Sequence, residues 1–188
     1  MAEPDDAAMR QALDQAHNAW LVGEVPVGAV IVRAGEQGHQ VIATGYNRPI
    51  TEHDPTAHAE IVALRHAALL LGNYRLPECE VFVTLEPCAM CAMALLHARV
   101  KRVVFAATDP KAGAAGSVID VFGNKALNHH TAVAGGVLQE RCAELLRSFF
   151  VERREQYRQR RAALDTPLDA DAIPTGEATE IGAAPPSS

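Results

Sequence analysis

The sequence predicts an α/β protein in which helices cover both faces of one mixed, five-stranded sheet. Helix-like and strand-like patterns alternate along the chain, and by the layer rule this order gives a single sheet packed between helices. Two β-rich runs near the N-terminus are separated only by residues 34–38, so the sheet should begin with an antiparallel hairpin. The 188 residues are 48% hydrophobic, which suits one domain with a sizeable core.

The first part of the chain should form a helix, the hairpin and a second helix. Apolar residues recur at intervals of three and four through residues 5–22, which predicts an amphipathic helix with Trp20 in the core. Residues 25–32 and 41–44 are rich in β-formers and are expected to be the hairpin strands. A second apolar-periodic run predicts a helix over 58–71.

The second part continues the alternation and ends in a long helix. A Gly- and Ala-rich loop at 108–117 follows a predicted strand, where α/β sheets usually carry ligand-binding residues. Gly135 and Gly136 weaken the last predicted strand. The predicted elements are strands at 80–85, 102–107 and 133–138, helices at 88–97 and 139–161, and a short helical turn at 118–122.

Charge is unevenly distributed along the chain. The formal net charge is -6, but residues 165–188 hold five of the 23 acidic residues and no Lys or Arg, so residues 1–164 are close to neutral. Residues 165–188 also carry four prolines and no aromatic residue, a composition that cannot offset the entropy cost of ordering. We therefore expect one domain at 1–164 and a disordered acidic tail at 165–188.

The N-terminus and the cysteines indicate a cytoplasmic protein. The first residues are acidic and no apolar segment follows them, unlike a secretory signal peptide, and no apolar run reaches the roughly 18 residues of a membrane span. Without a signal peptide, the four cysteines point to metal binding rather than to disulfides. Cys79 and Cys142 should be buried free thiols, which behave as small hydrophobic groups.

Two short motifs carry the chemistry: His-Ala-Glu at 58–60 and Pro-Cys-Ala-Met-Cys at 87–91. One imidazole and two thiolates suit tetrahedral Zn²⁺ and leave its fourth position open for water. Cys88 and Cys91 are three residues apart, so on a helix they face the same side and can bind one ion together. We therefore expect His58, Cys88 and Cys91 to hold one Zn²⁺ in each subunit.

Glu60 is expected to be the general acid and base of this site. Residues two apart on a regular helix point roughly 200° away from each other, so Glu60 is poorly placed to bind the same ion as His58. It is better placed to take a proton from water that zinc has made acidic and to return it. Both motifs should lie where a helix begins, and helix N-termini favour ionised thiolates and carboxylates.

A noncatalytic zinc module is an alternative from another class. In such a module Cys79 or Cys142 would complete a closed site of three cysteines and one histidine that holds the fold together. The two kinds of site differ in the fourth ligand, which is water in the catalytic site and a thiolate in the structural one.

Four longer strings surround and follow these motifs. They are Gly-Tyr-Asn-Arg-Pro at 45–49, His-Asp-Pro-Thr-Ala-His-Ala-Glu-Ile at 53–61, Thr-Leu-Glu-Pro-Cys-Ala-Met-Cys at 84–91 and Lys-Ala-Gly-Ala-Ala-Gly-Ser at 111–117. The His-x-Glu and Pro-Cys-x-x-Cys pattern is the signature of zinc-dependent nucleobase deaminases. Together the strings resemble the bacterial tRNA-specific adenosine deaminase family, over about residues 7–160.

The resemblance implies a fold, an activity and partners. The fold is the three-layer α/β/α arrangement of cytidine deaminase-like enzymes. The activity is zinc-dependent hydrolytic deamination of adenosine to inosine at the wobble position (34) of a tRNA anticodon, in which hydroxide attacks C6 of adenine and Glu60 moves the protons. The partners are a tRNA anticodon stem-loop and a second copy of the chain in a homodimer. For the homodimer the sequence adds only a nearly all-apolar helix at 88–97.

The resemblance also assigns contacts to the substrate. Asn47 looks like the family residue that hydrogen-bonds the nucleoside, and Asp109 like a contact to the nucleotide beside the edited base, although both also suit turns. Residues 141–161 contain seven Arg and three Glu, which could face phosphates or simply suit the end of a helix. The other expected contacts are the backbones of Ala59 and Leu85 with the base, and Asn128, Phe149, Arg153 and Arg154 with the anticodon stem-loop.

The metal signature alone does not define the substrate. Deaminases of free cytidine or guanine, as nucleosides or bases, share the ligand pattern and the chemistry. The flanking strings favour tRNA over these alternatives.

Overall fold

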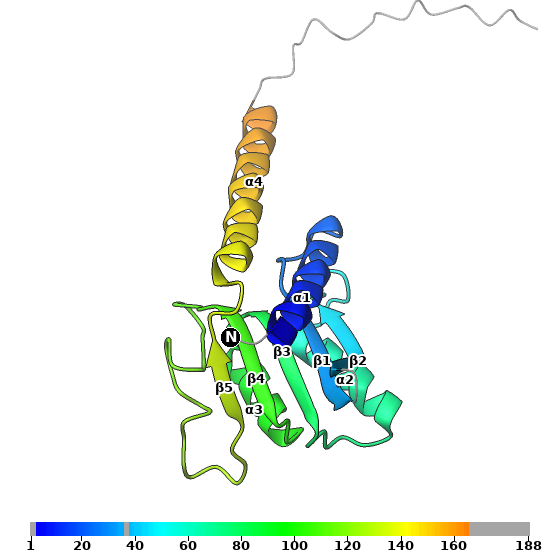
Figure 1. Cartoon of the computed structure of the whole chain (residues 1–188). Helices are drawn as coiled ribbons and strands as arrows, with labels where there is room; N and C mark the ends of the chain where they lie inside the picture. The colour runs from blue at the N-terminus through cyan, green and yellow to red at the C-terminus, as the bar shows by residue number, and fades with distance from the viewer. Residues whose placement is uncertain (1–2, 36–37, 166–188) are drawn as a thin grey trace, which may run out of the picture. The chain divides into compact units, whose positions relative to one another are not determined.

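The computed structural model describes residues 3–35 and 38–165, which form helices and strands in the predicted order (Figure 1). Every predicted strand and long helix is present. Their bounds are α1 Glu3–Leu21, β1 Gly28–Gly35, β2 Gly38–Tyr46, α2 Ala59–Leu71, β3 Cys79–Leu85, α3 Ala89–His97, β4 Arg102–Ala107, β5 Ala132–Gly135 and α4 Gln139–Asp165.

The strands form one five-stranded mixed sheet, as predicted, in the order β2-β1-β3-β4-β5. β1 pairs antiparallel with β2, its hairpin partner, and also with β3. β3, β4 and β5 are mutually parallel. Since β2 and β3 are both antiparallel to β1, the two strands that lead toward α2 and α3 run in the same direction and end at the same edge of the sheet.

The three predicted layers are also present. On one face, Met9 and Leu13 of α1 and Cys142 at the start of α4 pack against side chains of β1, β3 and β4. On the other face, α2 and α3 bury Leu64 and Leu95 in the second core cluster. Figure 1 shows α1 in front of the sheet and α2 and α3 behind it.

Close packing of α2 on the sheet depends on a glycine in β2. A Cβ built on Gly45 would lie 2.4 Å from the carbonyl oxygen of Ala59 and 2.6 Å from the backbone nitrogen of Ala63. Both distances are far shorter than any real contact, so only glycine lets the first turn of α2 approach β2 so closely. This packing holds the start of α2 at the edge of the sheet.

The structure corrects several details of the prediction. Residues 118–122 form bends, a turn and an isolated bridge between Ala115 and Asp120 instead of a helical turn. Trp20 is only half-buried, with its ring edge-on to Phe149 at 5.6 Å. β5 ends at Gly135, because the next glycine has a φ of 95° that no strand accommodates. β2 is longer than 41–44, because its polar first residues pair with the end of β1.

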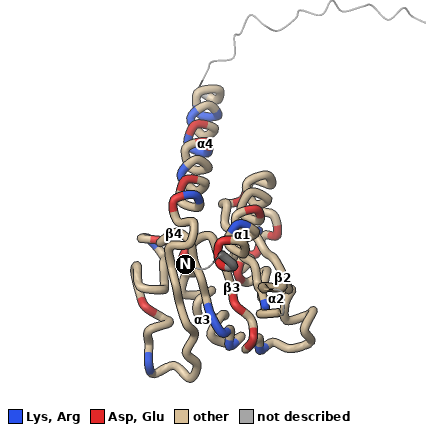
Figure 2. Tube along the Cα trace, viewed as in Figure 1, with Lys and Arg blue, Asp and Glu red and all other residues tan. Residues whose placement is uncertain are grey.

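By compactness the chain divides into two units, Met1–Glu152 and Arg153–Ser188. The division into a domain at 1–164 and a tail at 165–188 stays a prediction. α4 carries acidic and basic residues along its length (Figure 2). The predicted disorder of the tail concerns residues 166–188, which lie outside the described residues. Among the residues that are described, no helix is long and apolar enough to cross a membrane.

Candidate zinc site

Two of the expected ligands occupy the N-cap positions of neighbouring helices. His58 precedes α2 with φ -71° and ψ 155°, and Cys88 precedes α3 with φ -74° and ψ 172°. Most N-cap side chains accept a hydrogen bond from the first turn of their own helix. Neither His58 nor Cys88 does so, and both side chains instead turn toward Cys91, in the first turn of α3.

The three side chains form a cluster with the dimensions of a zinc site. Their ligand atoms all lie within 4.8 Å of one another, and this is the only such group of three or more in the described part of the chain. Nδ1 of His58 lies 3.7 Å from Sγ of Cys88 and 3.6 Å from Sγ of Cys91. Tetrahedral zinc with Zn–N of about 2.0–2.1 Å and Zn–S of about 2.3 Å separates nitrogen and sulfur by about 3.6 Å. The donors present therefore fit the ion.

Without a metal ion, one of the two cysteines is ionised and the other donates a hydrogen bond to it. The hydrogen bond from Cys91 lowers the pKa of Cys88 to about 4, and His58 adds to the effect. The same interaction raises the pKa of Cys91, and burial raises it further. Cys88 is thus a thiolate at neutral pH and Cys91 keeps its proton, which a bound metal ion would displace.

Glu60 lies in the first turn of α2 and is buried, with 4% of its surface exposed. Its carboxylate is not a member of the ligand cluster. Burial raises the pKa of Glu60, while its own backbone N–H and His58 act in the opposite direction. A carboxyl group buried beside a metal site is well suited to take up and return a proton.

Asn47 lies directly against the start of α2. Its Oδ1 accepts the backbone N–H of Ala59 at 2.9 Å, so this N–H, which was expected to meet the base, is used to orient Asn47 instead. The acceptor in this bond must be the amide oxygen, and Nδ2 therefore remains as the donor. Asn47 can present an N–H to a substrate beside the zinc cluster.

A buried glutamate that the sequence analysis did not single out anchors the segment carrying Asn47. Glu24 is 1% exposed, and its Oε1 accepts the backbone N–H groups of Ile50 at 2.9 Å and Thr51 at 2.7 Å. The segment is also tied to the start of α2, because the Arg48 N–H donates to the carbonyl of Ala57. The segment that carries Asn47 is therefore held by Glu24 on one side and by the residue before His58 on the other.

The loop that follows β4 lies on the other side of the cluster. Gly113 forms a bridge with Cys88, and the N–H of Ala114 donates to the carbonyl of Pro87 at 2.8 Å. Asp109 is half-buried at the start of this loop, where its Oδ1 accepts the N–H groups of Lys111 and Ala112. Asp109 thus makes the turn that its sequence suggested, which does not prevent its other oxygen from meeting a substrate.

The remaining expected contacts lie in different places. Leu85 is the last residue of β3 and is half-buried, close to the cluster in the chain. Asn128 is exposed beside a pocket of about 220 Å³ that includes His97, at the end of α3 opposite to Cys91. Phe149 is buried, with 4% exposed, so in the structure it packs against Trp20 and is not a surface contact. Arg153 and Arg154 are exposed on α4, within the second unit.

Comparisons with known proteins agree with this site. The family model for the cytidine and deoxycytidylate deaminase zinc-binding region matches residues 2–107. The fold and the site thus define a zinc-dependent deaminase of that class. The tRNA-specific adenosine deaminase of Haemophilus influenzae is 46% identical over 168 residues, which cover 89% of this chain and 95% of the relative. Within the class, the chain belongs to the tRNA-specific adenosine deaminase family.

Solved structures extend the comparison. One from a study of A-to-I editing by tRNA:A34 deaminases at the wobble position of transfer RNA superposes with a TM-score of 0.70 and 42% identity, over 74% of this chain and 98% of that one. Guanine deaminase from Nitrosomonas europaea gives a TM-score of 0.63 and 28% identity, over 79% of this chain and 85% of that one. The same fold therefore also occurs in a deaminase whose name specifies a free base.

Proposed function

We propose that the protein is a tRNA adenosine(34) deaminase, which converts adenosine to inosine at the wobble position of an anticodon and releases ammonia. The observation that carries the proposal is the cluster of His58, Cys88 and Cys91, with three protein donors and buried Glu60 beside it. Three donors leave a position for water, which is the arrangement of catalytic rather than structural zinc. The choice of substrate is supported by the tRNA-specific relatives.

Glu60 performs the proton transfers in the proposed mechanism. Zinc, when bound, acts as a Lewis acid that makes water a nucleophile near neutral pH. Glu60 takes one proton from that water while the water oxygen adds to C6 of adenine. Glu60 then passes this proton to the ring nitrogen. Glu60 then transfers the second proton of the water from the oxygen on C6 to the amino group, the C6–N bond breaks and ammonia leaves, so adenosine and water give inosine and ammonia. Asn47 donates from Nδ2 to the nucleoside and holds it in place.

Residues outside the cluster would contact the RNA around the reacting base. An anticodon loop presents its bases unpaired, which lowers the cost of bringing one into a pocket. Asp109 lies on the loop adjoining Cys88 and is suited to meet a flanking nucleotide. Asn128, Arg153 and Arg154 are exposed and are proposed as contacts to the stem-loop. Phe149 of α4 is buried against Trp20, so it would act indirectly, by supporting the exposed residues of its helix.

We also propose that the protein acts as a homodimer in the cytoplasm, where tRNA is modified. Ala92, Leu95 and Leu96 of α3 are buried within the subunit, so they are not the dimer contacts that an all-apolar helix suggested. The better support is a largely apolar groove of about 380 Å³ between α2 and α3, lined in part by Ile61 and Ala94. A monomeric mass at micromolar concentration would contradict this assembly.

The two alternatives make different demands on the chain. A closed structural site needs a third thiolate as its fourth ligand, but neither Cys79 nor Cys142 belongs to the ligand cluster. Cys79 begins β3, whose other end leads to Cys88, which places it too far away to complete the site. A free-base or nucleoside deaminase would have the same metal site and would differ from a tRNA deaminase only in its substrate.

The deciding experiment compares these substrates directly. The zinc-loaded protein is incubated with an anticodon stem-loop that has adenosine at its first anticodon position, and inosine is measured. Free adenosine, cytidine and guanine are assayed alongside, with Glu60→Ala as the inactive control. We expect deamination of the stem-loop and little of the free compounds. Equal or faster turnover of a free compound would overturn the proposal in favour of a nucleoside or base deaminase.

A further inference from the structure

A second buried carboxylate lies next to the zinc cluster and takes no part in it. Glu86 is 3% exposed and is located between the last residue of β3 and Pro87. Its Oε2 accepts the backbone N–H of Asp109 at 2.9 Å, and its Oε1 accepts the N–H groups of Ala115 at 2.9 Å and Ser117 at 3.1 Å. The Ser117 hydroxyl donates to Oε2 as well. All four donors belong to one loop, residues 109–117.

The loop packs so tightly against this carboxylate that residue 113 must be glycine. A Cβ built on Gly113 would lie 2.4 Å from Oε2 of Glu86 and 2.6 Å from the carbonyl oxygen of Asp109. No other residue type fits there without displacing the carboxylate or the loop. The glycine and the glutamate are therefore parts of one arrangement.

The donors match the chemistry of the ionised side chain. A carboxylate only accepts hydrogen bonds, and its two oxygens here receive two bonds each. The N–H and hydroxyl donors of the loop thus satisfy the carboxylate.

We propose that Glu86 is a positioning residue, which fixes the loop 109–117 beside the zinc cluster and thereby sets how strictly the enzyme selects the nucleotide next to the reacting base. The selecting side chain is Asp109, whose own N–H is held by Glu86. The inference rests on the proposed function for its substrate, but the anchoring of the loop does not.

The competing explanation is that Glu86 merely stabilises the fold, and β3 offers a matched control. Glu80 lies at the other end of the same strand, is also buried, and pairs with Lys101 at 3.6 Å and Arg102 at 3.2 Å. Replacing either glutamate by glutamine removes one buried charge, within β3 for Glu80 and directly after β3 for Glu86. Only the change at Glu86 alters the loop beside the zinc cluster.

The first experiment compares Glu86→Gln with Glu80→Gln. In Glu86→Gln the new amide brings N–H groups toward N–H donors, so the loop should loosen. We expect one zinc per chain in both variants. Amide hydrogen exchange at 109, 115 and 117 should rise in Glu86→Gln only. Its KM for the stem-loop should increase about tenfold or more, with a smaller change in kcat, because misplaced binding groups weaken productive binding. Discrimination between stem-loops that differ beside the reacting adenosine should also fall.

Three further variants keep the proposal testable if Glu86→Gln does not fold. Ser117→Ala removes only the hydroxyl donor and should shift KM and selectivity in the same direction, while Ser117→Thr, which keeps the hydroxyl, should restore them. Gly113→Ala should reproduce the defect by steric means. If Glu86→Gln and Ser117→Ala lower the melting temperature but leave loop exchange, KM and selectivity unchanged, the proposal is wrong. If the unmodified enzyme does not deaminate the stem-loop, the proposed function fails, and hydrogen exchange alone still decides whether Glu86 anchors the loop.

Discussion

The side-chain oxygen of Asn47 accepts the backbone N–H of Ala59, at 2.9 Å and immediately beyond the zinc-ligand candidate His58. This bond joins the segment after β2 to the first residue of α2. It also determines which polar atom of Asn47 is left for a substrate, since the oxygen is engaged and the amide N–H groups are not part of the bond. The position of a donor is thus fixed by the same helix that begins at the metal site.

Asn47→Asp tests this donor. The aspartate oxygen can still accept the Ala59 N–H, so the start of α2 and the zinc content should be retained. The second oxygen cannot donate, and we expect kcat/KM for the stem-loop to fall about ten- to hundredfold. Asn73→Asp is the matched control, because Oδ1 of Asn73 also accepts a backbone N–H, that of Arg75, beyond the far end of α2. A similar loss of activity in both variants would contradict a specific role for Asn47.

Glu60→Ala should separate proton transfer from metal binding. Zinc measured by mass spectrometry should stay at one per chain, because the carboxylate is outside the ligand cluster. The rate of deamination should fall by about 10² to 10⁴, the usual contribution of a general acid and base. Loss of zinc from this variant would instead mean that Glu60 is a ligand.

Cys88→Ala and Cys79→Ala should both lower stability, but only Cys88→Ala should lower the zinc content. Cys79 is buried and Cys88 is half-buried, so both variants should be less stable than the unmodified protein. For Cys79→Ala we expect a loss of about 1–2 kcal/mol because of the cavity it leaves. Only Cys88→Ala should lose zinc, since Cys79 is not in the cluster. The loss of zinc adds to the destabilisation because metal binding and folding are coupled. Full zinc content in Cys88→Ala would exclude it as a ligand.

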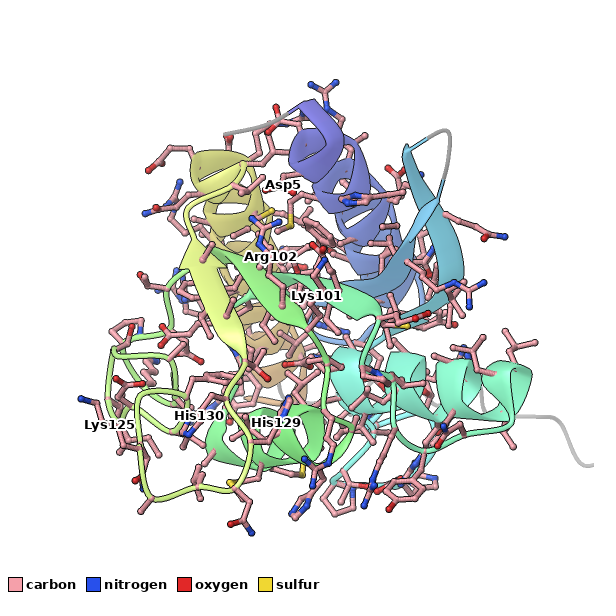
Figure 3. The ribbon with its side chains drawn as sticks, turned by 60° about the horizontal axis from the view of Figure 1, so that its bottom comes forward. Asp5, Lys101, Arg102, Lys125, His129 and His130 are labelled. Carbon is pink, nitrogen blue, oxygen red and sulfur yellow. The ribbon has the colours of Figure 1, made fainter. Side chains whose placement is uncertain are left out.

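The ion pair between Asp5 and Arg102 should make the fold sensitive to acid. Asp5 at the start of α1 is 8% exposed in its side chain and lies 2.7 Å from the guanidinium of Arg102 in β4 (Figure 3). The hydrogen bond from Arg102 is the largest cause that lowers the pKa of Asp5 from 3.8. A lowered pKa in the folded state means that the stabilisation is present above pH 3.8 and is lost as the pH falls below it, through the folded-state pKa.

Asp5→Asn should therefore lower the free energy of unfolding by about 1–3 kcal/mol near neutral pH, with the difference from the unmodified protein shrinking below pH 3.8. Denaturant unfolding at several pH values measures this difference. Asp6→Asn is the control, because the side chain of Asp6 is 42% exposed and lies as far as 4.0 Å from Arg10, so the loss of this ion pair should change little. A difference for Asp5→Asn that does not depend on pH would show that the charge is unimportant.

The sequence reveals those parts of the site whose partners are close in the chain. His58 and Glu60, and Cys88 and Cys91, are separated by two or three residues, so their spacing alone indicates which side chains can share an ion. The alternating apolar patterns likewise predict the five-stranded sheet and its layers. Gly136 was recognised only as a weak point in a strand, since its φ of 95° is not visible in the sequence.

Glu24 and Glu86 were missed because their partners are backbone N–H groups distant in the chain. The donors to Glu24 lie 26 and 27 residues later, and those to Glu86 lie 23 to 31 residues later. Any residue except proline supplies such a donor, so nothing in the sequence marks it. The available signal was a glutamate directly after the buried strand 80–85, where a charged residue needs a partner.

The last prediction concerns phosphate binding by Arg153 and Arg154, which are exposed on α4. If they meet the stem-loop, changing both to alanine should raise KM and make binding less dependent on salt, because fewer counterions are then released from the RNA. Each lost phosphate contact should reduce the slope of log affinity against log salt by about 0.7–0.9. Zinc content and the rate at saturating substrate should stay unchanged. The control changes Arg10 and Arg141, which are also exposed, to alanine and so alters the net charge equally. If the control reduces the slope as much, the effect comes from overall charge, and Arg153 and Arg154 do not form a specific contact.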